Sequence, residues 1–197
     1  MDLVGPMGTS DNGKKYILTI IDVFTRYLIT EPLSSKEATE VAKVFFDKVV
    51  CIHGAPKTVV TDQGKKFVNQ IFKGVTERLQ VSHVTITAYR PSANGVIKRA
   101  NYTVVNILRT LTEDNPKTWD EMLPVATYAY DSAYHRIIKD TPFYLLHMRD
   151  PPLPYQILDE VPKPWYNVDQ YKEEMALITK RTYERCAAYL EMGREEM

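Results

Sequence analysis

The sequence predicts an α/β fold in which parallel strands alternate with helices. Short apolar runs rich in β-branched residues lie at 16–21, 58–61 and 81–87, and segments with helical periodicity lie at 35–53 and 69–79. This strand–helix–strand–helix order is typical of domains with a parallel sheet. The chain has 197 residues, 44% of them apolar, which is enough to bury a core and excludes wholesale disorder.

The first third of the chain is expected to hold a hairpin followed by a helix. The run at 16–21 and a second run at 25–32 are close enough to pair with each other. Ser35 is the expected N-cap of the next helix. That helix is predicted to end near Gly54, because Pro56 lies just beyond it.

The second half of the chain is predicted to be mostly helical. Pro, Ser, Asn and Gly within residues 89–95 indicate a flexible loop there, and a helical pattern then runs from 96 to about 111. Another helix is expected over 119–133. Residues 140–166 contain six prolines and are predicted to form an extended, irregular connection. A long amphipathic helix over 168–192 follows, which we interpret as a linker or a self-association helix.

Charge and composition exclude several classes of protein. The 25 Lys and Arg residues balance 25 Asp and Glu residues, so a strongly basic nucleic-acid binder of the histone-tail type is excluded, but a local basic face is not. The stretch 78–112 has five basic residues and no acid, whereas the segment from 159 onward has nine acids and six bases. No apolar run approaches the roughly 18 residues of a membrane span, and no signal peptide opens the chain.

The cysteines and histidines do not indicate a metal or disulfide framework. Cys51 and Cys186 are far apart, which argues against a disulfide scaffold and favours a reducing, intracellular or nuclear location. No pair of histidines has zinc-ligand spacing, so a structural role is expected for each. The four are His53, His83, His135 and His147.

The strongest functional signal is a set of ordered motifs. The chain begins MDLVGP, carries TDQGKKF at 61–67 and YRPSANGVIKRAN at 89–101, and matches further at 16–27, with TPF at 141–143 and RDP at 149–151. Together these motifs resemble the catalytic core of retroelement integrases, specifically those of gypsy-class LTR retrotransposons. The resemblance runs from about residue 2 to residue 155.

This resemblance implies an RNase H-like fold, with a mixed sheet flanked by helices and an additional C-terminal helix. It places an integrase core-like domain at 1–155, and a Pro-rich connection with the C-terminal helix at 156–197. Three carboxylates in the family hold two divalent cations, usually magnesium, which drive in-line attack on phosphodiester bonds. Asp2 matches the first of these carboxylates and Asp62 the second, so both are the expected metal ligands.

The third carboxylate position departs from the family pattern. The family has a glutamate there, separated from the second aspartate by 35 residues, and this position is Lys98. The chain has no acid between Glu77 and Glu113 that could substitute. A protonated lysine cannot ligate magnesium, although its ammonium group could occupy the place of a cation between Asp2 and Asp62. We therefore expect crippled or absent catalysis, with Lys98 either a bystander or a selected replacement.

Asp22 is a tempting alternative acid because it follows a predicted strand. Its counterpart in the family lies outside the triad, so we expect a structural role. A triad built with Asp22 would still lack the glutamate.

The resemblance and the local charge together predict contacts with DNA. Tyr89 and Asn94 match loop positions that approach DNA in the family, and other cations flank the motifs. The expected nucleic-acid-binding residues are Tyr89, Arg90, Asn94, Arg99, Lys65 and Lys66. The competing interpretation is a merely solvated helix face. We expect DNA as a partner, a homodimer, and no membrane association.

Two other interpretations remain open. The first is a repurposed non-enzymatic module that binds DNA or protein. The second is an RNase H-like nuclease of another kind. Changing Lys98 to glutamate discriminates a decayed enzyme from a repurposed module.

Overall fold

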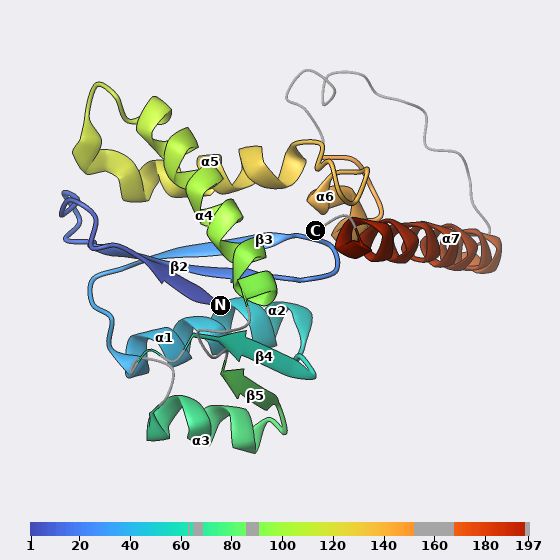
Figure 1. Ribbon diagram of the computed structural model, residues 1–197, viewed down its shortest axis with the longest axis horizontal. Coiled ribbons are helices and arrows are strands. Elements are labelled where there is room, and N and C mark those ends of the chain that lie inside the picture. The colour runs from blue at the N-terminus through green and yellow to red at the C-terminus, as the bar shows by residue number, and fades with distance from the viewer. Residues whose placement is uncertain (63, 65–68, 86–90, 152–167, 196–197) are drawn as a thin grey trace. The chain divides into compact units, whose positions relative to one another are not determined.

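The computed structural model describes residues 1–62, 64, 69–85, 91–151 and 168–195 (Figure 1). The chain forms two compact units. The first comprises residues 1–21 and 28–130, and the second comprises residues 22–27 and 131–197. The predicted boundary between residues 155 and 156 lies outside the described residues.

The first unit contains an antiparallel sheet in the order β1–β2–β3, formed by Asp2–Val4, Tyr16–Ile21 and Leu28–Leu33. In its register Asp2 lies opposite Thr19, and Ile20 lies opposite Ile29. The predicted hairpin is therefore confirmed.

The strand β3 begins later than expected, because a tight turn occupies residues 22–27. Asp22 closes this turn, since its Oδ2 accepts hydrogen bonds from the backbone N–H of Thr25 at 2.8 Å and from its hydroxyl at 2.6 Å. Arg26 takes the left-handed conformation with φ of 64°. Asp22 thus has the structural contacts that its predicted role requires.

Helix α1, Ala38–Phe45, continues through a π-helical turn, η1 at Phe46–Val50, into α2 at Cys51–His53. It ends at Gly54, as predicted, where φ is 86°. The predicted N-cap was wrong, because the cap position is Glu37 and Ser35 lies outside the helix. The Ser35 hydroxyl donates instead to Glu40 at 2.7 Å, and this contact competes with capping.

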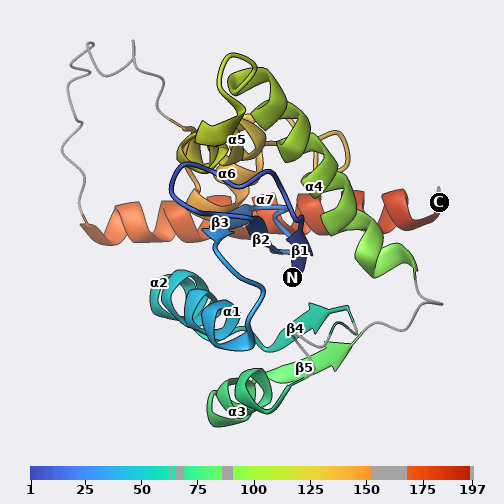
Figure 2. The same cartoon turned by 90° about the vertical axis from the view of Figure 1, so that its left-hand side faces the viewer.

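The parallel pair consists of β4, Thr58–Thr61, and β5, Ser82–Thr85, joined through α3, Gln70–Arg78. Asn69 caps α3 by accepting a hydrogen bond from the Phe72 N–H at 2.9 Å. Helices α1 and α3 pack against one another (Figure 2), and the rings of Phe45 and Phe72 lie 5.6 Å apart. This part of the first unit confirms the predicted alternation of strands and helices.

Helix α4 spans Pro91–Leu111, and α5 spans Trp119–Ser132 after a short 3-10 turn, η2, at Pro116–Thr118. The predicted loop at 89–95 was wrong over 91–95, because these residues form the first turn of α4, where the fixed φ of a leading proline suits a helix; residues 89 and 90 lie outside the described part of the chain. The two helices bury a second core against β2. Its fully buried members include Ile17, Ala100, Val104, Leu108, Leu123 and Ala126.

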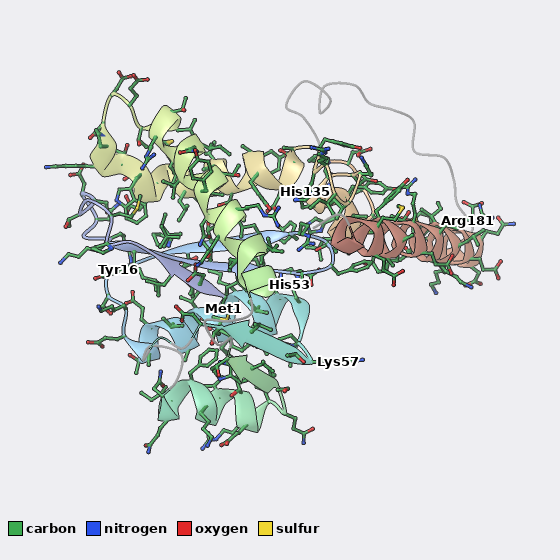
Figure 3. All side chains as sticks on the ribbon, viewed as in Figure 1. Met1, Tyr16, His53, Lys57, His135 and Arg181 are labelled. Atoms are coloured by element: carbon green, nitrogen blue, oxygen red, sulfur yellow. The ribbon has the colours of Figure 1, made fainter. Side chains whose placement is uncertain are left out.

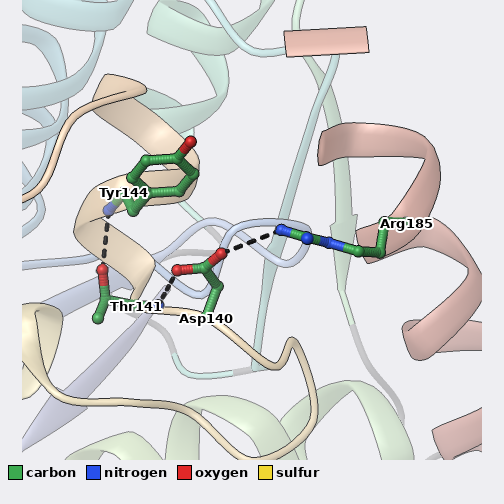
Figure 4. A network of polar contacts seen from close by, with 4 residues as sticks. All are labelled: Asp140, Thr141, Tyr144 and Arg185. Atoms are coloured by element: carbon green, nitrogen blue, oxygen red, sulfur yellow. Dashed lines mark hydrogen bonds and ion pairs between the residues drawn. The ribbon is translucent and has the colours of Figure 1, made fainter. Parts of the chain in front are cut away.

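In the second unit, α6, Pro142–His147, interrupts the stretch that was predicted to be irregular. Thr141 starts this helix, since its hydroxyl accepts a hydrogen bond from the Tyr144 N–H at 3.0 Å. Figure 4 shows how the neighbouring Asp140 extends the network: it accepts the Thr141 N–H at 2.9 Å and forms an ion pair with Arg185 at 3.3 Å. A local cap therefore outweighs the proline-rich composition here.

The long helix α7, Val168–Glu195, is close to its predicted bounds. Its C-terminal half packs through Cys186 against Ile138 and Leu145. Cys51 and Cys186 are both free thiols. Among the helices that the structure describes, none is both long and apolar enough to cross a membrane.

Candidate active site

Asp2 and Asp62 both lie near the α-amino group of Met1, and they come from two different strands. Asp2 opens β1, where its backbone carbonyl accepts a hydrogen bond from the Thr19 hydroxyl at 3.2 Å. Asp62 directly follows β4. Both carboxylates act on the α-amino group of Met1, which donates to the Val60 carbonyl at 2.7 Å. Burial lowers the pKa of that amino group to about 6, while the two carboxylates oppose this effect.

The Asp2 carboxylate is held by two donors. Its Oδ1 accepts the Leu3 N–H at 2.8 Å, and its Oδ2 accepts Nδ2 of Asn101 at 2.9 Å. Asn101 belongs to α4 and is only 8% exposed. Its Oδ1 is buried and has no hydrogen-bond partner within the described part of the chain. Because each carboxylate oxygen offers two lone pairs, Asp2 keeps capacity for a further ligand.

Asn101 is the site residue that sequence reasoning did not assign. It was noted only as matching the motif around position 98. A usable signal was present, because residues three apart on a helix face the same side. A helix that brings position 98 toward Asp2 must bring Asn101 there as well.

Lys98 lies one helical turn before Asn101 and is exposed. The described residues include no ion pair between Lys98 and either aspartate. Its ammonium group therefore does not occupy the place of a cation between the two carboxylates, as one interpretation of the sequence suggested. The position extends into solvent beside the site.

Asp62 is held in a turn. Its Oδ1 accepts the Gly64 N–H at 3.0 Å, and its backbone carbonyl accepts the Thr61 hydroxyl at 3.0 Å. The same hydroxyl lies 2.9 Å from Nε2 of His83 on β5. Burial lowers the pKa of His83, which favours its neutral form at neutral pH. These contacts are structural, as expected for this histidine.

The donor set fits one hard cation better than two. No group of three or more His, Cys, Asp or Glu side chains that could hold a metal occurs among the residues described. Two carboxylates and the unsatisfied amide oxygen of Asn101 remain. Magnesium is often held by one or two carboxylates and waters, so these oxygens suit a single ion. A second ion would need a third carboxylate, and the family resemblance assigns that position to Lys98.

The exposed face of α4 is basic. Lys98, Arg99 and Arg109 are exposed, Tyr102 between them is 72% exposed, and the helix contains no acid. Arg99 donates through Nε to the Gly95 carbonyl at 3.2 Å. Tyr102 is an addition to the predicted set, whereas Arg109 belongs to the basic stretch 78–112 that the sequence had already indicated. The signal for Tyr102 was an aromatic residue four positions after Lys98, in a helix stripe that is otherwise polar.

The other predicted nucleic-acid contacts are not placed by the structure. Lys65, Lys66, Tyr89 and Arg90 lie outside the described residues. Asn94 falls within the first turn of α4, and its side chain is not described. Arg99 is thus the predicted contact whose side chain can be assessed.

Comparison with known proteins supports the integrase resemblance. A family model described as integrase core domain matches residues 1–91. The retrovirus-related Pol polyprotein from transposon 412 of Drosophila melanogaster is 29% identical over 198 residues, covering 100% of this chain and 16% of that protein. The gypsy retrotransposon integrase-like protein 1 of Bos taurus is 26% identical over 154 residues, covering 78% of this chain and 30% of that protein. The chain thus spans less than a third of these curated relatives.

Solved integrase structures share the fold. The simian T-cell lymphotropic virus intasome, in complex with PP2A regulatory subunit B56 gamma, gives a TM-score of 0.65 at 21% identity, covering 84% of this chain and 59% of that one. The HTLV-2 integrase catalytic core domain in complex with magnesium, in its trimeric form, gives a TM-score of 0.59 at 17% identity, and the match covers 72% of this chain and 91% of that one. The predicted RNase H-like fold is therefore confirmed. Sequence and fold together confirm the resemblance that the motifs predicted: this chain is similar to the integrase core of gypsy-class retrotransposons, with the core-domain family match at residues 1–91.

Proposed function

We propose that this chain is an integrase-core-like domain that binds DNA and whose ancestral reaction, metal-dependent strand transfer in DNA integration, is impaired. The observation that carries the proposal is the position of Lys98. It precedes Asn101 by one turn of α4, and Asn101 contacts Asp2. This contact supports the assignment of Lys98 to the position where the family has its third carboxylate.

The loss of that carboxylate acts on metal binding first. Asp2 and Asp62, with Oδ1 of Asn101 nearby, would hold one magnesium ion, which would supply Lewis-acid polarisation of a phosphate oxygen. The protonated Lys98 offers no lone pair, and its charge opposes a second cation. Without the second ion, the attacking and leaving oxygens are no longer both stabilised.

DNA binding rests on the basic face of α4. Lys98, Arg99 and Arg109 can contact phosphates, and the ring of Tyr102 offers a stacking surface. Such contacts do not depend on base sequence, so binding is expected to be general and salt-sensitive. DNA as the partner implies a nuclear or other intracellular site of action, and a homodimer would present two such faces.

The metal site is tested by Lys98→Glu. With magnesium at ten times its dissociation constant, a restored site stabilises the folded chain by about 1.4 kcal/mol, or roughly 3–6 °C in Tm. The matched control is Arg109→Glu, which makes the same charge change on the same helix about 16 Å away. We expect magnesium to raise the Tm of Lys98→Glu by more than it raises the Tm of Arg109→Glu or of the original chain, because those two keep only the site for one ion.

Strand transfer is measured on the same proteins with DNA ends and magnesium. Activity gained by Lys98→Glu supports a recently decayed enzyme, and stabilisation by magnesium without activity supports a repurposed module. Efficient, Asp62-dependent strand transfer by the original chain would contradict impairment.

DNA binding is tested by titrating a duplex at low and high salt. We expect Arg99→Ala and Arg109→Ala each to weaken binding and to reduce the salt slope by about one. Lys73→Ala on α3 is the control, because Lys73 is exposed and already paired with Glu77 at 3.7 Å. A DNA-binding affinity that does not change with salt concentration would overturn the proposed phosphate contacts.

A further inference from the structure

The buried stripe on the C-terminal half of α7 defines one face of the helix. Thr182 and Cys186 are buried, and Leu190 packs partly against the same cluster. Gly193 lies on this face, where an added Cβ would be 3.3 Å from Ile137. The ion pair between Arg185 and Asp140 borders this face (Figure 4).

The same stripe continues into the N-terminal half of α7, where Tyr171 and Ile178 are exposed and Met175 is partly buried. Tyr171, Met175 and Ile178 precede Thr182 at spacings of four and three, so they share its face. Tyr171 is 47% exposed and Ile178 is 43% exposed. An apolar stripe at heptad spacing is the surface that pairs helices in coiled coils.

We propose that residues 171–181 of α7 pair in antiparallel orientation with the same segment of a second copy of this chain. The charged residues beside the stripe support a second copy of this chain as the partner. Glu174 and Arg181 are exposed along one edge of the stripe, and Figure 3 labels Arg181 on α7. A two-fold pairing of Met175 with Ile178 of the second copy places Glu174 beside Arg181 of the second copy, twice. In a parallel pair, Glu174 would face the uncharged Thr179 instead.

The size of the contact sets its strength. Eleven residues of helix span about 16 Å, because each adds about 1.5 Å. Such an interface buries less than the roughly 1,000 Å² of a stable complex, so the pair should be weak and dependent on concentration. The interface lies wholly in α7 and does not depend on the proposed DNA binding by α4.

Sedimentation velocity from about 1 to about 200 μM tests the pairing. We expect the original chain to dimerise within this range and Ile178→Glu to weaken the dimer at least tenfold. The matched control is Leu177→Glu, because Leu177 is 49% exposed but projects about 200° around the helix from Met175. Circular dichroism confirms that both variants keep their helices.

A charge exchange tests the orientation. Glu174→Arg and Arg181→Glu should each weaken the dimer, because each places like charges together, and the combined variant should restore it. A chain that stays monomeric throughout, equal effects of the Ile178 and Leu177 changes, or no restoration in the combined variant would each overturn the proposal. DNA binding should be the same in Ile178→Glu and the original chain when both are measured as monomers, which separates this test from that of the proposed function.

Discussion

Replacing Asn101 by alanine removes the amide that donates to Asp2 at 2.9 Å. A hydrogen bond to a charged group contributes about 1.5–3 kcal/mol, and Asn101 is buried, so we expect a loss of about 2 kcal/mol. For a chain of this length, that corresponds to a decrease in Tm of roughly 4–8 °C. Asn106→Ala is the control on the same helix, because its contact with Arg109 is exposed and 3.3 Å long, and it should cost less than about 0.5 kcal/mol.

Asn101→Asp makes the same contact repulsive without changing the size of the side chain. Two carboxylates about 4 Å apart repel by about 4 kcal/mol at an effective dielectric constant of 20, so the folded pair retains a proton. The unfolded chain releases that proton above about pH 4. The folded state then binds more protons, and its stability relative to the original chain falls as the pH rises from 4 to 7. The deficit of Asn101→Ala should depend far less on pH.

Thermal unfolding at pH 5 and pH 7.5, with EDTA and then with magnesium, measures these effects. We expect the deficit of Asn101→Asp to be larger at pH 7.5 and to shrink with magnesium, because the variant adds a carboxylate beside Asp2. A deficit equal at both pH values, or a variant as stable as the original chain, would show that Asn101 does not contact Asp2 in solution.

Two further predictions concern the core and a local network of the first unit. Phe72 is fully buried and its ring lies 5.6 Å from that of Phe45, so Phe72→Ala should destabilise the fold by about 3–5 kcal/mol. The control is Ile71→Ala at the exposed neighbouring position, which should cost less than about 0.5 kcal/mol. Urea unfolding measures both losses of stability. Burial favours a raised pKa for Glu40, but hydrogen bonds from the Ser35 hydroxyl and nearby backbone N–H groups outweigh it and lower that pKa. This stabilisation is present at pH values above the pKa that Glu40 has in the unfolded chain, and it is lost as the pH falls through the pKa that Glu40 has in the folded chain. Ser35→Ala should therefore raise the pKa of Glu40 in an NMR titration and reduce stability at pH 7 but not at pH 3, and an unchanged titration would contradict the network.

Periodicity was enough to predict most of the elements. The alternation in 58–61 and 81–87 placed the parallel strands, and the helical pattern placed α5 and α7 within a few residues of their ends. The errors arose where a side chain can form a hydrogen bond with either of two nearby groups. Ser35 bonds Glu40 rather than capping α1, and Thr141 starts a helix inside a proline-rich stretch. Composition alone does not predict which of these hydrogen bonds forms, because that depends on hydrogen-bond geometry.

The candidate site was predicted only in part, for a physical reason. Motifs pointed to Asp2, Asp62 and position 98, but the contact between Asp2 and Asn101 joins residues 99 positions apart. A contact of this kind exists only once the strands and α4 have packed, so the helical spacing from position 98 could indicate the face on which Asn101 lies but not its partner. The free Oδ1 of Asn101 likewise follows from burial by its neighbours.

The packing of α4 has a genetic consequence. Ile97 and Ala100, on either side of the exposed positions 98 and 99, are buried, and Val104 and Leu108 anchor the rest of the helix. The backbone that would present a glutamate at position 98 is therefore still held in place by the core. Lysine and glutamate codons differ in their first nucleotide alone. A single A-to-G transition at this codon would give the candidate site a third carboxylate without repacking the domain.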